Sequence, residues 1–209
     1  MATERTRAPI SLKNEIEEPI SAEDEPLDFN DEPTDRHVVC IVLTPDLKYV
    51  AWVFNLEYPA GKPKGWGIVG GRSENKGESV IDVAKREIWE ETGIPKDKIE
   101  ILEIVCQGWV HDKYRGSEYM RTILICVTRH PGNPKIQALA EDGTPQTREF
   151  RWFPLDKPPS MQELGESVYF KHTNTIPEAL IVIDELKYSK HWPLIQEAKE
   201  EWDFNCAVR

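Results

Sequence analysis

GGRSENKGESVIDVAKREIWEETGI, residues 70–94, is the stretch that decides the fold of this chain. Its second half, Val80–Thr92, is predicted to be a helix because apolar side chains recur three and then four residues apart. The side chains that would form this stripe against a core are Ile81, Ala84 and Ile88. Gly93 suits the left-handed backbone just past a helix end, and Pro95 cannot continue the helical hydrogen bonding. We therefore expect the helix to end at Thr92.

The other face of this predicted helix concentrates negative charge. Glu87, Glu90 and Glu91 stand at i, i+3 and i+4, so their Cβ atoms would lie about 5–6 Å apart on one side. Like charges at this spacing repel, and near a helix C-terminus they also oppose the macrodipole. A hard divalent cation with oxygen ligands would neutralise them. Glu78 can fold back onto the same face, and Arg86 can hold one carboxylate bidentately and fix its direction.

The alternative interpretation is that these glutamates are solvated surface groups, since charge runs are usually exposed faces. The surrounding residues favour the metal interpretation. Glu78 is followed, after seven residues, by the sequence REIWEETGI at Arg86–Ile94. This pattern is similar to the Nudix box of the Nudix hydrolase family, which reads G, five residues, E, seven residues, then REUxEExGU with U aliphatic. Every fixed position from Glu78 to Ile94 matches.

The start of the box departs from the family pattern. Counting back from Glu78, the leading glycine would fall at Arg72, whereas glycines stand at Gly70 and Gly71. The loop between Gly71 and Glu78 is therefore one residue longer than in the standard box. Val69 also stands where many relatives carry proline. These departures concern the path of the loop and the role of Gly71, but not the helix with its carboxylates.

The resemblance covers about residues 36–156 and implies an α/β fold, a Nudix-like α/β/α sandwich with a mixed sheet. Strand-like segments on both sides of the carboxylate helix, and helices at the end, indicate the same layers. The resemblance also implies a Nudix-type pyrophosphohydrolase, in which water attacks phosphorus in the diphosphate linkage of a nucleoside diphosphate linked to another moiety. The expected cofactor is Mg²⁺ or Mn²⁺, shared between carboxylates and substrate phosphates.

The resemblance assigns roles to individual side chains. The expected metal ligands are Glu78, Glu87, Glu90 and Glu91. The expected catalytic residues are Arg86, Glu87, Glu90 and Glu149. The general base would be Glu87 itself or a later carboxylate, of which the candidates are Glu149, Glu141 and Asp142. Each of these later carboxylates has a simpler reading as a solvated strand end or turn. The expected substrate contacts are Gly71, Arg72, Lys113 and Arg115.

Two other function classes stay open. One is a non-catalytic, nucleotide-sensing Nudix module, and the other is a different reaction on the same scaffold, either isoprenyl diphosphate hydrolysis or removal of the 5′ cap from RNA. The intact REUxEE weighs against the first, because a binding-only domain has no need of mutually repelling carboxylates. Cap removal usually requires a basic surface, which a net charge of −11 does not supply.

Composition and cysteine usage narrow the expected partners and compartment. The net charge of −11 over 209 residues argues against binding to DNA or to an anionic membrane and leaves a small nucleoside diphosphate-type substrate as the partner. The cysteines, which form no CxxC pair, are Cys40, Cys106, Cys126 and Cys206. The first three lie in apolar strand-like runs, so we expect buried free thiols in a reducing cytoplasm.

Residues 1–35 differ in composition from the rest of the chain. They carry eleven acidic side chains against three basic ones, a balance of eight negative charges. We expect a flexible tail, because this segment buries too little apolar area to offset its ordering entropy. The alternative is an interaction arm that docks on a partner subunit. Residues 36–209 are the expected Nudix domain with C-terminal helices, and since members of the family are often dimers, a homodimer is one assembly to expect.

The remaining segments predict strands around the carboxylate helix and helices at the end. The expected strands are a hairpin over residues 36–55 with a turn at Pro45–Asp46, then Lys64–Gly71, the pair Ile99–Val110 and Tyr119–Arg129, and an alternating strand at Arg148–Pro154. In the loop between the paired strands, Lys113 or Arg115 would contact a phosphate and Tyr114 would stack a base, unless the loop is an ordinary polar turn. The expected helices are Ile176–Lys187, opened by Thr175 and Pro177, and His191–Trp202.

Overall fold

The computed structural model describes residues 36–56, 64–74, 77–112, 117–133, 147–164, 166, 168 and 170–207. The chain divides into two units, Met1–Asp31 and Glu32–Arg209, and every described residue lies in the second. Two sets of predictions fall outside the described residues. They are the tail over residues 1–35, and the side chains of Lys113, Tyr114, Arg115, Glu141 and Asp142.

The elements follow the predicted order. The strands are β1 (Arg36–Leu43), β2 (Tyr49–Asn55), β3 (Gly65–Ile68), β4 (Ile99–Asp112), β5 (Ser117–Thr128) and β6 (Thr147–Pro154). The helices are α1 (Val80–Thr92), α2 (Met161–Leu164), α3 (Phe170–Glu185) and α4 (Trp192–Ala207), with 3-10 turns η1 (Lys96–Lys98) and η2 (Leu186–Tyr188). The predicted strands are therefore present, and β4 and β5 each extend two residues further toward their connection than the sequence indicated.

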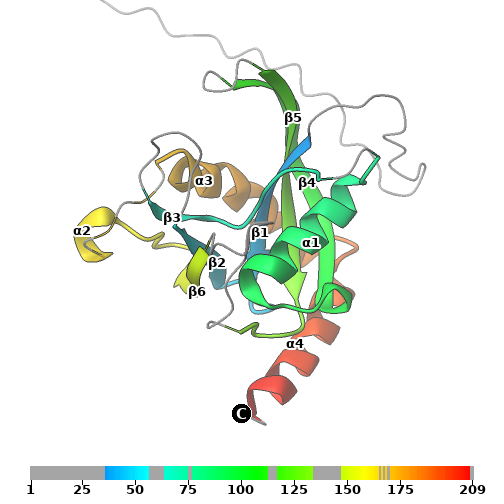
Figure 1. Ribbon diagram of the computed structural model, residues 1–209. Helices are drawn as coiled ribbons and strands as arrows, with labels where there is room; N and C mark the ends of the chain where they lie inside the picture. Colours follow the sequence, from blue (N-terminus) through cyan, green and yellow to red (C-terminus); the bar gives the residue numbers. More distant parts are fainter. Residues whose placement is uncertain are drawn as a thin grey trace, which may run out of the picture. The chain divides into compact units, whose positions relative to one another are not determined.

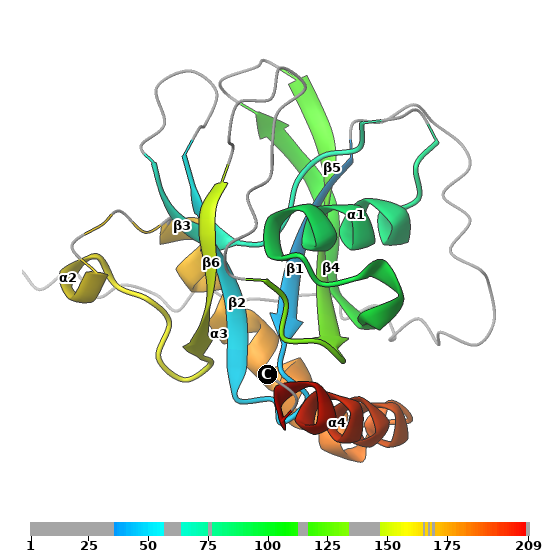
Figure 2. The ribbon, with the colours of Figure 1, turned by 60° about the horizontal axis from the view of Figure 1, so that its bottom comes forward.

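Within the described residues, six strands form one sheet in the order β3-β2-β1-β5-β4, and β6 pairs with β2. β1 runs parallel to β5, from Arg36 opposite Met120 to Leu43 opposite Val127. The other strand pairs are antiparallel, so the sheet is mixed. α1 lies on one face of this sheet and α3 on the other (Figures 1 and 2). The predicted α/β/α sandwich is confirmed.

Each face of the sheet has its own apolar core. Along β1, Val39 and Ile41 belong to the core beneath the C-terminal helices, together with Trp52, Trp66, Ile176, Ile183 and Ile195. The alternate residues Val38 and Cys40 are also fully buried and point to the opposite face, where α1 packs on β1. Burying a large apolar side chain contributes about 1.5–3 kcal/mol. The core on the second face therefore holds α1 on β1 at the centre of the sheet.

The buried face of α1 differs from the predicted apolar stripe. Ile81 is 40% exposed, whereas Val80 is 2% exposed. Ile81 lies on the flank of the helix in its first turn. The other two predicted positions, Ala84 and Ile88, are fully buried, and the buried face also includes Val80, Val83 and Glu91. Glu91 is only 7% exposed. The prediction that the glutamates stand on a face separate from the core was therefore wrong for Glu91.

The C-terminal helices also differ in part from their prediction. α3 begins at Phe170 and contains Pro177, so Thr175 does not begin this helix. A proline inside a helix removes one backbone hydrogen bond. Ile176 and Ala179, on either side of Pro177, are buried in the core, and tertiary packing of this kind holds a helix that propensity alone would end. α4 is present where it was predicted, and its Ile195 and Ala198 are fully buried.

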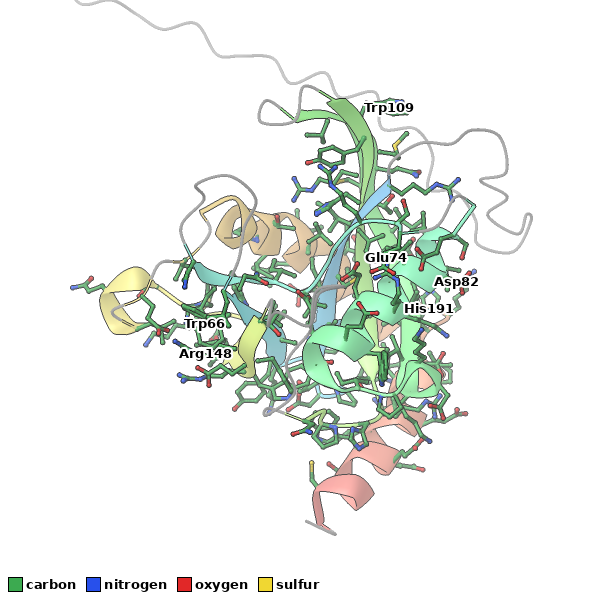
Figure 3. The ribbon with its side chains drawn as sticks, in the orientation of Figure 1. Trp66, Glu74, Asp82, Trp109, Arg148 and His191 are labelled. Carbon is green, nitrogen blue, oxygen red and sulfur yellow. The ribbon has the colours of Figure 1, made fainter. Side chains whose placement is uncertain are left out.

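Two smaller predictions fail at exposed strand positions. All four cysteines are free thiols, but Cys106 is exposed while Cys40 and Cys126 are buried. Cys106 begins a run of exposed residues that ends at Trp109, near the outer end of the β4–β5 hairpin (Figure 3). The predicted alternation of β6 is absent from its burial, because most of its residues are only partly exposed, on both faces of the strand. Among the described helices, none is both long and apolar enough to cross a membrane.

Candidate active site

The segment between β3 and α1 is tied along β1 by its backbone. The N–H groups of Cys40, Val38 and Ser73 donate to the carbonyls of Val69 (2.8 Å), Gly71 (2.9 Å) and Arg36 (2.9 Å), respectively. Gly70 has a φ of 154°, and a Cβ atom there would lie 2.2 Å from the carbonyl oxygen of Val38. Only glycine allows this close approach of two backbones. The approach brings Gly71 and Arg72 against α1.

Both ends of α1 are capped. Ser79 Oγ accepts a hydrogen bond from the Asp82 backbone N–H at 3.1 Å and donates to the Asp82 carboxylate at 2.7 Å. An N-cap bond of this type is worth about 1 kcal/mol. At the other end, Gly93 adopts the predicted left-handed conformation and donates to Trp89 O at 2.8 Å. The caps fix the length of the helix and so the direction in which its glutamates project.

Arg86 is buried at the centre of a group of carboxylates. We name this group the acidic cluster; it consists of Glu78, Glu87, Glu90 and Glu91. Arg86 Nε and Nη2 donate to the two carboxylate oxygens of Glu78 at 2.9 and 3.3 Å, the bidentate geometry that the sequence predicted. Arg86 Nη1 donates to Glu87 at 2.9 Å and to Glu90 at 3.2 Å. Although burial opposes the charge, the hydrogen bond to Glu78 and the charge of Glu87 raise the pKa of Arg86.

Glu91 is the buried member of the acidic cluster, and the Glu87 side chain next to it is 13% exposed. Glu91 is 7% exposed and accepts a hydrogen bond from the Gly70 N–H at 3.0 Å. Burial, and then the charge of Glu87, raise the pKa of Glu91 well above its ordinary value. Burial likewise raises the pKa of Glu87 to about 7, although the Arg86 guanidinium opposes this change. Part of the cluster therefore holds protons near neutral pH unless another positive group is supplied.

The donor atoms of the acidic cluster suit a hard cation. All are carboxylate oxygens, the ligands that Mg²⁺ and Mn²⁺ prefer. Among the described residues, no group of three or more His, Cys, Asp or Glu side chains is already arranged around a single metal position. The contacts of Arg86 give the reason, because its Nη1 lies within hydrogen-bond distance of both Glu87 and Glu90. The guanidinium thus provides the positive charge at these oxygens.

A model of the NUDIX domain matches residues 33–172. The chain belongs to the Nudix family. Membership of this family makes it a Nudix-type pyrophosphohydrolase. No curated protein matches the chain.

The chain is also similar to solved structures of Nudix proteins. A MutT/nudix family protein from Enterococcus faecalis is 18% identical and aligns over 82% of this chain and 70% of its own, with a TM-score of 0.50. A Caenorhabditis elegans Ap4A hydrolase is 16% identical, with coverage of 72% and 98% and a TM-score of 0.49. An ADP-ribose pyrophosphatase from Streptococcus suis is 19% identical, with coverage of 77% and 96% and a TM-score of 0.48. At such identities the likeness concerns the fold.

The Nudix domain brings most of the predicted site residues together. Around Arg86 lie Glu78, Glu87, Glu90 and the carbonyl oxygen of Arg72, which accepts from Arg86 Nη2 at 2.7 Å. Glu149 is not part of this group. Its carboxylate accepts from Arg148 at 2.8 Å and from Arg151 at 3.0 Å. Figure 3 shows Arg148 beside Trp66, on the β3 and β6 side of the sheet and away from Glu74 and Asp82 at the start of α1.

Sequence reasoning missed two side chains of the Nudix site. Glu74 Oε1 lies 3.5 Å from Arg86 Nη1, and the Glu74 backbone N–H donates to Glu78 at 3.1 Å. The only sequence feature that pointed to a role for Glu74 was its position inside the lengthened loop. Arg36, at the start of β1, donates from Nη1 to the Glu78 carbonyl at 3.0 Å. Because 42 residues separate Arg36 from Glu78, no local pattern could have connected them.

Replacing Gly71 by alanine is expected to lower magnesium-dependent turnover by about 10–100-fold with little loss of stability. A Cβ atom at Gly71 would lie 2.2 Å from Glu87 Oε1, so this carboxylate would have to rotate away from Arg86. The flexible end of Glu87 can make this movement, which is why the fold should survive. Gly108→Ala is the matched control, because no atom lies within 4 Å of a Cβ added there. Equal turnover in both variants would contradict the role of Gly71.

The metal-free Nudix protein is expected to lose stability as the pH rises from about 4.5 to about 7. Glu87 has its pKa raised from 4.5 to about 7 in the folded state. A carboxylic acid of this kind stabilises the fold while protonated and loses that contribution as it ionises. For Glu87 alone, the free energy of unfolding should fall by about 3 kcal/mol over this pH range. Urea unfolding in the presence of a chelator, at several pH values, measures it, and Glu87→Gln should flatten the slope. Parallel pH profiles for the two proteins would contradict the prediction.

Proposed function

We propose that this Nudix protein uses Mg²⁺ or Mn²⁺ to hydrolyse the diphosphate linkage of a nucleoside diphosphate linked to another moiety. The observation that carries the proposal is the burial of two neighbouring carboxylates, Glu87 and Glu91, whose pKa values are both raised. Arg86 contacts Glu87, whereas Glu91 accepts only a neutral backbone N–H group among the contacts described. Ionised carboxylates in such a place are costly unless a further positive charge compensates them. A divalent cation supplies that charge.

The acidic cluster provides the proposed metal ligands Glu78, Glu87, Glu90 and Glu91. A bound cation would offset the charge of the diphosphate and lower the pKa of a coordinated water. Arg86 is assigned a positioning role. Its two hydrogen bonds to Glu78 fix the direction of that carboxylate, and its backbone bond to Arg72 fixes the loop.

Glu87 is the general base that the contacts favour. A base works best when its pKa lies near the operating pH. Without a cation, burial raises the pKa of Glu87 to about 7, and a cation bound by the acidic cluster would lower it from there. In the proposed step, a water oxygen bonds to phosphorus, Glu87 takes the proton, and the bridging P–O bond breaks. Glu149 was predicted as an alternative base, but its carboxylate accepts hydrogen bonds from two guanidinium groups. These contacts tie Glu149 to Arg148 and Arg151, outside the acidic cluster.

The proposed partner is a small nucleoside diphosphate-type molecule, and Gly71, Arg72, Lys113 and Arg115 remain the proposed substrate contacts. Free thiols at all four cysteines support an assignment to the cytoplasm, where disulfides are rare. ADP-ribose and Ap4A are the first compounds to test, because structural neighbours include an ADP-ribose pyrophosphatase and an Ap4A hydrolase. A homodimer stays part of the proposal and is checked by light scattering.

A substrate panel with product identification tests this function. The compounds are ADP-ribose, Ap4A, a nucleotide sugar, nucleoside triphosphates, capped RNA and an isoprenyl diphosphate, each with Mg²⁺, with Mn²⁺ and with a chelator. We expect cation-dependent turnover of at least one nucleoside diphosphate derivative, and ¹⁸O from labelled water in a phosphorylated product. Tight nucleotide binding without turnover would support the nucleotide-sensing module instead. Turnover restricted to capped RNA or to isoprenyl diphosphate would overturn the proposed substrate class.

A further inference from the structure

Arg121, on β5, carries its positive charge in a partly buried place. Its Nε atom is buried and has no hydrogen-bond partner among the described residues. Within the same part of the chain, no carboxylate lies at ion-pair distance from the Arg121 guanidinium. Acidic side chains are not scarce, because they outnumber basic ones by 37 to 26. Carboxylates do form ion pairs with other arginines, namely Arg86, Arg129, Arg148 and Arg151.

The strand register explains why Arg121 meets no opposite charge. Side chains at paired positions of neighbouring strands share one face of a sheet. Arg121 pairs with His37 of β1 on one side and with Gly108 of β4 on the other. Along β5, the residues two positions away share its face, and they are Tyr119 and Ile123. None of these four neighbours carries a carboxylate, so the nearest positions on the sheet offer Arg121 no anion.

Arg72 connects the face of Arg121 with the acidic cluster. Its backbone forms an antiparallel bridge with His37, so the side chain of Arg72 lies on the face of Arg121. On the other side of the loop, the carbonyl oxygen of Arg72 accepts from Arg86 Nη2 at 2.7 Å. Two strand spacings, about 10 Å, separate the backbones of Arg121 and Arg72. A ligand that extends from the acidic cluster past Arg72 therefore reaches Arg121.

An anionic ligand would remove an energetic cost at Arg121. A buried donor without an acceptor costs about 1–3 kcal/mol, and more when the group is charged. Phosphate oxygens accept charge-assisted hydrogen bonds from a guanidinium. The anion at Arg121 is a different group from the diphosphate at the acidic cluster. His37 alternates along β1 with Val38, whose side chain faces α1, so Arg121 lies on the face opposite to α1.

We propose that Arg121 is a specificity-determining residue that binds a phosphate group of the substrate beyond the two at the acidic cluster. This inference deepens the proposed function and rests on it. The substrate class it names is a nucleotide with three or more phosphates, such as ATP or Ap4A. ADP-ribose has only the two phosphates of its diphosphate and would leave Arg121 without an anion. The contact is made to bound substrate, so its loss should raise KM more than it lowers kcat.

Steady-state kinetics of Arg121 variants on ATP, Ap4A and ADP-ribose, each with Mg²⁺, test the inference. We expect Arg121→Gln to raise KM for ATP and Ap4A by about 10–100-fold, with kcat within about twofold. Its KM for ADP-ribose should stay within about twofold of wild type, which also shows that the fold is intact. Arg121→Lys keeps the charge without the planar fork and should recover part of the loss. Arg151→Gln is the control, because Arg151 pairs with Glu149 at 3.0 Å and is 49% exposed.

Several results would overturn the inference. They are equal rises of KM for ADP-ribose and for ATP, a loss of kcat in place of a rise in KM, or Arg121→Gln behaving like Arg151→Gln. If Arg121→Gln does not fold, the same comparison of ATP with ADP-ribose in Arg121→Lys decides.

The failure of the inference and that of the proposed function can be told apart. If wild type hydrolyses ADP-ribose but neither binds nor hydrolyses ATP or Ap4A, the proposed function stands and the inference fails. If wild type binds these compounds with Mg²⁺ but turns none over, hydrolysis fails, and Kd values of Arg121→Gln from calorimetry still decide the inference. If wild type neither binds nor hydrolyses any of them, both proposals fail.

Discussion

Glu90→Gln is expected to abolish magnesium-dependent hydrolysis, lowering turnover by about 10³-fold or more, while the protein keeps its fold. Glutamine has the shape of glutamate and can still accept the hydrogen bond from Arg86, which spans 3.2 Å in the wild type. What it lacks is the negative charge that a cation requires. Turnover should be measured at saturating Mg²⁺ with the best substrate of the panel, and folding by thermal unfolding.

The control for this variant is Glu197→Gln on α4. Glu197 also lies near an arginine, at 3.7 Å from Arg129, but its side chain is 68% exposed. An exposed pair of this kind contributes about 0–1 kcal/mol, so Glu197→Gln should retain the wild-type rate. If Glu90→Gln also retained that rate, Glu90 would not be a metal ligand, and the metal assignment of the acidic cluster would be wrong. Without added metal, Glu90→Gln should be no less stable than wild type, since burial raises the pKa of Glu90.

Arg86→Met is expected to destabilise the metal-free protein by about 3–5 kcal/mol near neutral pH. The guanidinium is the positive group bonded to Glu78, Glu87 and Glu90, and methionine fills a similar length without charge. Its loss removes a hydrogen-bonded positive charge from beside these carboxylates. The loss should be smaller near pH 5, where Glu87, with a pKa of about 7, is already protonated. Chemical unfolding at both pH values measures the difference.

Arg151→Met provides the comparison for Arg86→Met. Arg151 also forms an ion pair, with Glu149 at 3.0 Å, but its side chain is 49% exposed. Solvent screens such a pair, so its removal should cost less than about 1 kcal/mol. A cost for Arg86→Met as small as that for Arg151→Met would mean that the acidic cluster does not depend on Arg86. Added Mg²⁺ should restore part of the stability of Arg86→Met, because the cation binds the folded state.

The helix and its C-terminal cap could be predicted from the sequence because the relevant signals are local. Gly93 ends α1 with the expected left-handed conformation, and the glutamates and Arg86 fall within one short motif. The burial of Glu91 could not be predicted from the same motif. It depends on which side of α1 meets β1, and apolar periodicity placed Ile81 on that side although 40% of it is exposed. A carboxylate on the buried face interrupts the apolar periodicity, so periodicity alone assigns it to the exposed face.

The contacts around the acidic cluster were harder to predict because they join distant segments. Arg36 reaches Glu78 from the start of β1, and Tyr119 reaches Arg72 from the start of β5. Sheet order decides these contacts, and a single sequence does not reveal that β5 lies next to β1. The role of Gly71 was also hard to predict, because it too depends on a contact between separate segments. Its lack of a side chain leaves room for the Glu87 carboxylate, and this need appears only when the loop and α1 are placed together.

The parallel pairing of β1 with β5 has a consequence for how the chain is made. Arg36 of β1 pairs with Met120 of β5. Eighty-four further residues must therefore be synthesised after Arg36 before its partner on β5 exists. Pairings between strands so distant in sequence form slowly, since a long loop must close first. During synthesis, the hairpin of β1 and β2 and then α1 leave the ribosome well before β5 does. In that interval the uncovered edge of β1 is a place where nascent chains can associate wrongly, and where chaperones would be needed most.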